Sequence, residues 1–165
     1  MLTLGIDPGL ATTGYGLVAD TNGHLQAVDY GYIDTQPDLP LPERLLIIFR
    51  DVKSLLEKYS PNAMSIEQLF FCKNTRTALQ VGQARGVIIA AAAQLGCPVY
   101  EYTPLQVKQS IAGYGKADKK QVQQMVRLIL KLKEVPKPDD VADALAIAVN
   151  HIQISKWHKL LETQK

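Results

Sequence analysis

Residues 2–9 read LTLGIDPG, an apolar run that ends in one acidic residue and a turn-forming Pro-Gly pair. A short apolar run closed by a turn signal predicts a buried β-strand. Asp7 ends that strand, where a buried charge without a partner would be costly. A second apolar run, residues 63–66, ends in the same way at Glu67. Taken alone, either acid has an ordinary explanation, as a turn residue or as a surface carboxylate.

Two further acids, Asp140 and Asp143, stand three residues apart at the start of a late helix rich in Ala, Leu and Ile. Alone, they fit the preference of acids for a first helical turn, which Asp139 would satisfy equally well. Drawn together, the four carboxylates form an oxygen-only site that suits Mg²⁺ or Mn²⁺ rather than zinc. Without a cation, such carboxylates would raise one another's pKa. The combination therefore predicts a metal site.

The hydrophobic pattern predicts an α/β domain with a mixed five-stranded sheet flanked by helices. Three strands come first, with a Thr21-Asn22-Gly23 hairpin turn, and strands then alternate with helices. We expect one domain over residues 1–155 and a polar, basic tail over 156–165 that frays. The expected strands are 2–6, 14–19, 25–33, 63–68 and 98–102, and the expected helices are about 42–59, 75–95, 105–112, 119–133 and 140–154.

The composition, 47% hydrophobic and 21% charged over 165 residues, is ordinary for a folded domain. The longest apolar stretch, residues 87–95, is too short to span a bilayer, so we expect no membrane partner. Cys72 and Cys97 are two lone thiols, and Met1 leads directly into the first strand. These features indicate a cytoplasmic protein without a secretory leader.

Acidic and basic residues are unevenly distributed, although the net charge is only +2. Residues 1–70 contain nine acidic and four basic residues, whereas residues 104–133 contain seven basic residues and one acid. A basic segment beside a carboxylate site suits a polyanion bridged to metal, but a solvated helix face would look the same. The turn at residues 113–116 lacks the P-loop pattern. It presents Lys116, Lys119 and Lys120 near a helix N-terminus, which favours phosphate.

The loop that follows Glu67 places two aromatic residues beside two cations. Aromatic rings stack on unpaired bases, while Lys73 and Arg76 are suited to phosphates. Alternation suggests that one of Phe70 and Phe71 packs inward and the other faces outward. We expect Phe70 to face a base.

The helix expected at residues 75–95 has no clear polar face after Arg85. Gly82, Gly86 and Ala90 recur every four residues and leave a groove where another helix could approach. A helix that is apolar nearly all round must be buried. Burial against its own sheet would explain the pattern, and so would packing on the sheet with one side and on a second copy of the chain with the other.

Seven motifs, in order between residues 2 and 151, resemble those of the bacterial RuvC Holliday junction resolvases. They are Gly5-Ile6-Asp7-Pro8-Gly9, Thr13-Gly14-Tyr15-Gly16, Ile66-Glu67-Gln68, Lys73-Asn74, Gly82-Gln83-Ala84-Arg85-Gly86-Val87, Gln106-Val107-Lys108-Gln109 and Asp140-Val141-Ala142-Asp143-Ala144-Leu145-Ala146-Ile147-Ala148. The resemblance implies a ribonuclease H-like fold and a homodimeric, Mg²⁺-dependent endonuclease that cuts four-way DNA junctions by paired symmetric nicks. It also implies a partnership with the RuvAB branch-migration complex.

The resemblance also assigns roles to residues of this chain. The catalytic acids fall on Asp7, Glu67, Asp140 and Asp143, and the DNA-contacting residues on Lys108, Lys119 and Phe70. Two Mg²⁺ ions per site, with Mn²⁺ as a substitute, would activate a water and stabilise the departing 3′ oxygen. The products would be a 5′ phosphate and a 3′ hydroxyl. We choose Asp140 over Asp139 because its partner three residues on is Asp143.

Other functions fit parts of the pattern. Actin-like and sugar-kinase ATPases also open with Gly-Ile-Asp-x-Gly, but 165 residues leave no room for their second ATP-binding half. A non-catalytic junction-binding module would keep the basic segment and Phe70 and would have no need for four acids. A related nuclease fold that acts on RNA is a further alternative.

Overall fold

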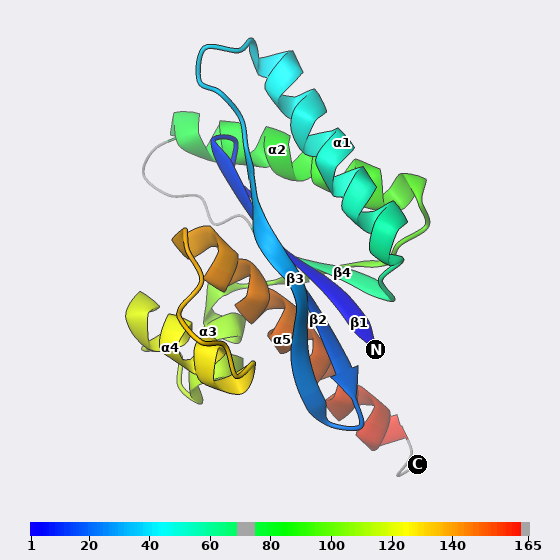
Figure 1. Ribbon diagram of the computed structural model, residues 1–165, viewed down its shortest axis with the longest axis vertical. Helices are drawn as coiled ribbons and strands as arrows, with labels where there is room; N and C mark the ends of the chain where they lie inside the picture. Colours follow the sequence, from blue (N-terminus) through cyan, green and yellow to red (C-terminus); the bar gives the residue numbers. More distant parts are fainter. Residues whose placement is uncertain (69–74, 163–165) are drawn as a thin grey trace.

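The computed structural model describes residues 1–68 and 75–162, without the side chains of residues 75–77, 159 and 162. In these ranges a five-stranded sheet carries helices on both faces (Figure 1). The strands are β1 (Leu2–Asp7), β2 (Thr12–Thr21), β3 (His24–Asp34), β4 (Ala63–Glu67) and β5 (Val99–Tyr102). The helices are α1 (Leu41–Tyr59), α2 (Thr75–Gln94), α3 (Pro104–Ala112), α4 (Lys119–Ile129) and α5 (Asp139–Glu162).

The sheet has the order β3-β2-β1-β4-β5 and confirms the mixed arrangement expected from the sequence. β1, β2 and β3 pair antiparallel, whereas β1, β4 and β5 are parallel to one another. The carboxyl ends of parallel strands meet at one edge of a sheet. The last residues of β1 and β4, Asp7 and Glu67, therefore lie at the same edge.

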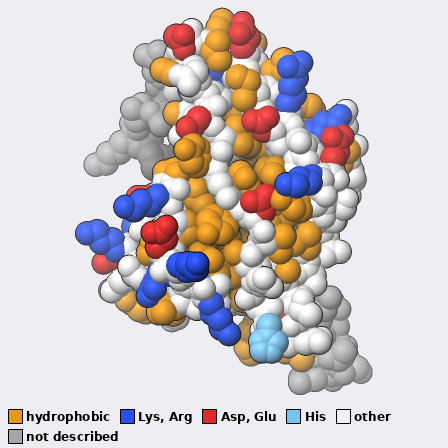
Figure 2. All heavy atoms as spheres, viewed as in Figure 1, with side chains coloured by type: hydrophobic (Ala, Val, Ile, Leu, Met, Phe, Trp, Pro, Cys, Tyr) orange, Lys and Arg blue, Asp and Glu red, His pale blue; other side chains and the backbone are white. Residues whose placement is uncertain are grey.

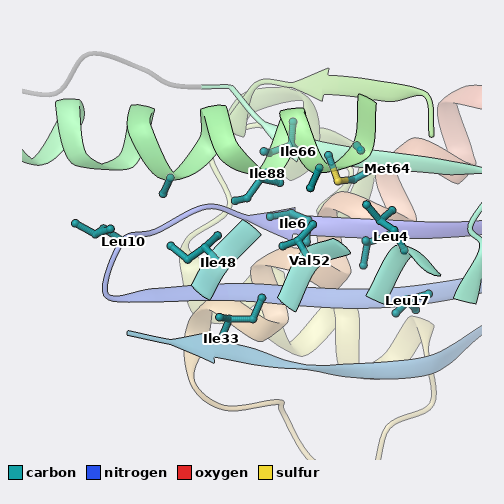
Figure 3. Packing of buried hydrophobic residues seen from close by; sticks show 14 residues of the cluster. Leu4, Ile6, Leu10, Leu17, Ile33, Ile48, Val52, Met64, Ile66 and Ile88 are labelled. Atoms are coloured by element: carbon teal, nitrogen blue, oxygen red, sulfur yellow. The ribbon is translucent and has the colours of Figure 1, made fainter. Parts of the chain in front are cut away.

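The two faces of the sheet bury separate apolar clusters. α1 and α2 cover one face, where Leu4, Ile6, Met64 and Ile66 pack against helix residues such as Ile88 (Figure 3). α3, α4 and α5 cover the other face and pack with Val18 and Tyr102 (Figure 1). Because successive strand side chains point to opposite faces, the alternate residues of β1 and β4 face α5.

Three glycines let α5 lie directly on the strands. A Cβ added to Gly5 would come within 2.1 Å of the carbonyl oxygen of Ala144, and one added to Gly14 would come equally close to that of Asp140. A Cβ at Gly16 would meet the side chain of Leu145 at 2.7 Å. The absence of these side chains lowers the first turn of α5 onto the sheet beside the end of β1.

Two helix ends differ from the sequence-based expectation. α4 stops at Ile129 because Lys131 adopts a left-handed backbone (φ 53°), and the N–H of Leu132 bonds to the carbonyl of Arg127. A non-glycine residue gives no sequence signal for such an end. α5 continues to Glu162, beyond the expected residue 154, because no Gly or Pro interrupts good helix formers there. No helix in the described ranges has the length and apolar character needed to cross a membrane.

Candidate active site

Asp7 and Glu67 project from the sheet toward α5. Their neighbours Ile6 and Ile66 pair in register and point into the cluster under α1 and α2, so the acids point to the opposite face. Ser65, two residues before Glu67, confirms this direction, because its Oγ lies 3.3 Å from the carbonyl oxygen of Ile147 in α5. Both acids are partly buried.

The first turn of α5 brings the other two acids to the same place. The backbone of Asp140 lies over Gly14, and Gly14 pairs with Asp7 across β1 and β2. Asp143, one turn further along, lines a cavity of about 180 Å³ together with Glu67, Lys108 and Lys119. The four carboxylates predicted from the sequence are thus brought together by three elements, β1, β4 and α5.

The pKa values record the crowding of these carboxylates. The pKa of Asp7 is raised to about 8, first by burial and then by the charges of Glu67, Asp143 and Asp140, against a smaller lowering by Lys119. Burial is also the largest cause that raises the pKa of Glu67 and of Asp143. Carboxyl groups with raised pKa values occur where a fold buries them or holds like charges together. Asp139 does not contribute to the shift at Asp7, which supports Asp140 as the member of the cluster.

Lys119 lies among the carboxylates, a position that the sequence did not indicate. Its Nζ is 3.0 Å from Oδ2 of Asp143 and 3.4 Å from Oδ2 of Asp139. The preceding residue, Asp118, caps α4 by accepting a hydrogen bond from the N–H of Gln121 at 2.8 Å. The expected phosphate position at this N-terminus is therefore shared with a capping carboxylate, and the ammonium group of Lys119 turns toward α5. No spacing rule could have found this contact, because it joins two helices.

The other predicted DNA-contacting residues lie at different distances from the cluster. Lys108 lines the same cavity as Glu67, whereas Lys120 lines a separate hollow with Tyr114, and Lys116 is exposed in the turn before α4. Figure 2 shows Lys and Arg side chains gathered over α4 and the segment leading to α5. Three predicted contacts cannot be placed: Phe70 and Lys73 lie outside the described residues, as does the side chain of Arg76.

The donor set suits a hard divalent cation by its chemistry, since it consists of carboxylate oxygens that repel one another. Over the described residues, however, no three Asp, Glu, His or Cys side chains are arranged so that they could share a metal ion. The Lys119 ammonium group instead provides positive charge to Asp143. Any cation at this site would compete with that ion pair.

Comparisons with known proteins agree on one family. The family model described as crossover junction endodeoxyribonuclease RuvC matches residues 3–151. The protein of that name from Brevibacillus brevis is 57% identical over 165 residues, which cover 100% of this chain and 99% of the relative. The one from Desulfitobacterium hafniense is 57% identical over 151 residues, 92% of each chain.

Solved structures give the same result. The structure of T. thermophilus RuvC in complex with Holliday junction substrate superposes on this chain with a TM-score of 0.92 at 40% sequence identity. The superposition covers 96% of each chain. The yeast mitochondrial Holliday junction resolvase Ydc2 shares the fold, with a TM-score of 0.67 at 15% identity over 99% of this chain and 86% of its own. The chain belongs to the crossover junction endodeoxyribonuclease RuvC family, with the ribonuclease H-like fold and the junction-resolving endonuclease function expected from its sequence.

Proposed function

We propose that the chain resolves four-way DNA junctions by Mg²⁺-dependent hydrolysis, as a homodimer that makes paired symmetric nicks. The observation that carries this proposal is the meeting of Asp7, Glu67, Asp140 and Asp143 at one sheet edge, where burial and mutual repulsion raise the pKa of Asp7 to about 8. A fold that holds such a cluster with only partial compensation by Lys119 is suited to a cation.

In this proposal the four carboxylates would hold two Mg²⁺ ions, and Asp7 is the acid on which the charges of the other three act. The ions would lower the pKa of a water and stabilise the leaving 3′ oxygen. Mn²⁺, which takes the same oxygen ligands, should substitute. Hydrolysis leaves a 5′ phosphate and a 3′ hydroxyl, the ends that a ligase can rejoin.

Lys119 has two roles in the proposed cycle. In the absence of a cation its Nζ pairs with Asp143 and Asp139. When cations neutralise the carboxylates, the ammonium group becomes free to meet a DNA phosphate. Lys108, on the wall of the same cavity, is placed to meet a neighbouring phosphate. The more distant contacts that we propose are Lys116, Lys120, Lys73, Arg76 and the base-stacking Phe70.

The homodimer is proposed on the outer side of α2. Ala84, Ile88, Ala91 and Ala92 are buried toward the sheet and α1. On the opposite side, the exposed positions between residues 79 and 93 are Leu79, Gly86, Ala90 and Ala93. None of these four residues is charged. Small, uncharged residues allow two helix backbones to approach closely. The RuvAB branch-migration complex, which delivers junctions, is the further partner that we propose.

A cleavage assay on three substrates tests the proposed activity. Junction DNA should be cut in Mg²⁺ or Mn²⁺, whereas linear duplex and RNA–DNA hybrid of the same sequence should stay intact. Ca²⁺ should support binding but little cleavage, because it tolerates looser geometry. Preferential cleavage of the hybrid would favour the RNA-directed alternative, and binding without cleavage under every metal would favour the non-catalytic module.

Gly86→Leu tests the dimer. A Cβ at Gly86 meets no atom within 4 Å in the single chain, so the substitution leaves the protomer room to fold. At a close helix–helix contact the same side chain would overpack, at a cost of about 1–3 kcal/mol. We expect sedimentation to show a shift toward monomer, and a cruciform plasmid to yield nicked rather than linear product. Asp51→Leu, on α1, is the matched control. A wild-type monomer that still makes paired cuts would contradict the dimer.

A further inference from the structure

Arg85 connects α2 to the end of β4, from the face of the sheet opposite the carboxylate cluster. One guanidinium nitrogen, Nη2, lies 2.7 Å from Oε1 of Glu101 in β5. Nε donates to the backbone carbonyl oxygen of Glu67 at 3.3 Å. The Arg85 side chain is only 17% exposed, whereas that of Glu101 is 43% exposed, so the bond to the Glu67 carbonyl is the better shielded of the two contacts. Charge-assisted hydrogen bonds from a largely buried guanidinium group fix the geometry of their partners.

The peptide group between Glu67 and Gln68 is thereby held at both of its polar atoms. Its carbonyl accepts from Arg85, and its N–H donates to the carbonyl oxygen of Tyr102 at 2.8 Å. This peptide is the last one of β4. The direction in which a strand side chain projects follows from its own backbone. The two bonds therefore set the direction in which Glu67 reaches toward the cluster.

The contact of Arg85 differs from that of the lysines around the cluster. Lys119 and Lys108 are the cations whose charges lower the pKa of Glu67, against the larger effects of burial and of Asp143. Arg85 is not one of these cations, and its charge is met by Glu101. Its contact with Glu67 is to the main chain alone. A residue in this arrangement acts on the position of the carboxylate rather than on its charge.

We propose that Arg85 is a positioning residue for cleavage, which holds the Glu67 peptide so that the Glu67 carboxylate stays within the cluster. This inference rests on the proposed catalytic role of Glu67. Arg85 also precedes Gly86, the residue at the centre of the proposed dimer contact. The same helix thus supports the active site through its inner side and presents its outer side to a second copy.

The test compares Arg85→Met with Arg85→Lys. Arg85→Met removes both contacts. We expect the single-turnover cleavage rate to fall about 10- to 100-fold, the effect typical of residues that hold a metal-binding side chain in position. The affinity for junction DNA in Ca²⁺ should stay unchanged, while half-maximal cleavage should need more Mg²⁺. Arg85→Lys should recover only part of the rate, because one ammonium group cannot span both partners. Lys53→Met, which removes an exposed ion pair with Glu57 on α1, is the control and should have no effect.

A second measurement needs neither metal nor cleavage. In the metal-free protein, Arg85→Met should speed hydrogen exchange at the Gln68 amide and leave the amides of α1 unchanged. Sedimentation should show the wild-type subunit count. Wild-type rate and exchange in Arg85→Met would overturn the proposal, and so would a loss of rate explained by dissociation. If Arg85→Met does not fold, wild-type rates in both Arg85→Lys and Glu101→Gln would overturn it equally.

The outcome is separable from that of the proposed function. Cleavage by Glu67→Gln at the wild-type rate would remove the catalytic role of Glu67 itself. An inactive Glu67→Gln beside a fully active, folded Arg85→Met would leave that role intact and remove the positioning role alone.

Discussion

Two groups of polar side chains, one partly buried and one largely buried, lie along α5 on the same face of the sheet, and they differ in how each is compensated. At the first turn, burial raises the pKa of Asp7, Glu67 and Asp143, and the charges of neighbouring carboxylates add to this effect. Two turns later, His151 has a partner at each ring nitrogen. The hydroxyl of Tyr102 lies 2.7 Å from its Nδ1, and Oγ of Ser155 lies 3.3 Å from its Nε2.

Burial favours the neutral form in both groups, and it therefore shifts the pKa of an acid and of a histidine in opposite directions. It lowers the pKa of His151 to about 4, so the ring is neutral at pH 7 and packs as an ordinary core residue against Tyr100 and Tyr102. The pKa of Asp7 is raised to about 8, because burial and neighbouring charges of the same sign both disfavour its ionised form. Burial of polar groups therefore does not identify a functional site. Like charges that are held together and only partly compensated, as they are here by Lys119, point to a site where a ligand supplies the remaining charge.

The largest expected effect is on catalysis. Asp7→Asn and Glu67→Gln should reduce junction cleavage to background, because each removes a ligand charge from the proposed metal site. Junction binding in Ca²⁺ should hold or improve, since repulsion of the DNA falls. Asp29→Asn is the matched control, an acid of β3 that pairs with Lys58 and accepts from Tyr59. Cleavage by either site variant at near wild-type rate under saturating Mg²⁺ would show that the catalytic residues are wrongly assigned.

The next effect is on stability in the absence of metal. Asp7 has a pKa of 3.8 when unfolded and about 8 when folded, so between these values the unfolded state has lost a proton that the folded state keeps. The contribution of Asp7 to stability is therefore present below pH 3.8 and is lost as the pH rises through 8. Relative to Asp7→Asn, the wild type should lose at most about 1.4 kcal/mol per pH unit between pH 5 and 7. Urea unfolding of both proteins in EDTA measures this slope, and parallel pH profiles would contradict it.

A smaller effect is expected at the compensated group. Tyr102→Phe removes the partner of Nδ1 in His151 and should cost about 1–3 kcal/mol of unfolding free energy at pH 7. Cleavage should persist, because the Tyr102 carbonyl that holds Gln68 is retained. In the wild type, the contribution of His151 is present above its unfolded pKa of 6.5 and is lost as the pH falls toward 4. Loss of cleavage in a stably folded Tyr102→Phe would assign this group a functional role.

The smallest effect concerns the basic side of the cavity. Lys108→Ala and Lys119→Ala should each weaken junction binding and reduce the log–log salt slope by about 0.9 for one lost phosphate contact. Fluorescence anisotropy over a salt series in Ca²⁺ measures both quantities. Lys58→Ala, on the α1 side of the molecule, should leave them unchanged. Unchanged salt slopes for both variants would indicate that the basic segment is a solvated helix face and does not contact phosphates.

Much of the fold could be predicted because local signals agreed with tertiary structure. All five predicted strands are present in the structure, and the acids at the ends of two of them lie at the proposed site. The errors occurred at helix ends. α4 ends at a left-handed lysine, for which the sequence has no signal, and α5 continues past residue 154 because nothing there stops it. Phe70 and Lys73 stay predictions, since they lie outside the described residues.

The sequence by itself determined which acids form the proposed site, because strand ends and helical spacing are local properties that residue types reveal. Tertiary structure alone decided how those acids are held. Gly5 and Gly14 have meaning only once α5 lies on them, and Lys119 meets Asp143 only because α4 packs on α5. Arg85 reaches the carbonyl of Glu67 from the opposite face of the sheet. Contacts of this kind join residues far apart in the chain, and the pKa of each carboxylate depends on burial and charge in three dimensions, which no spacing along the chain encodes.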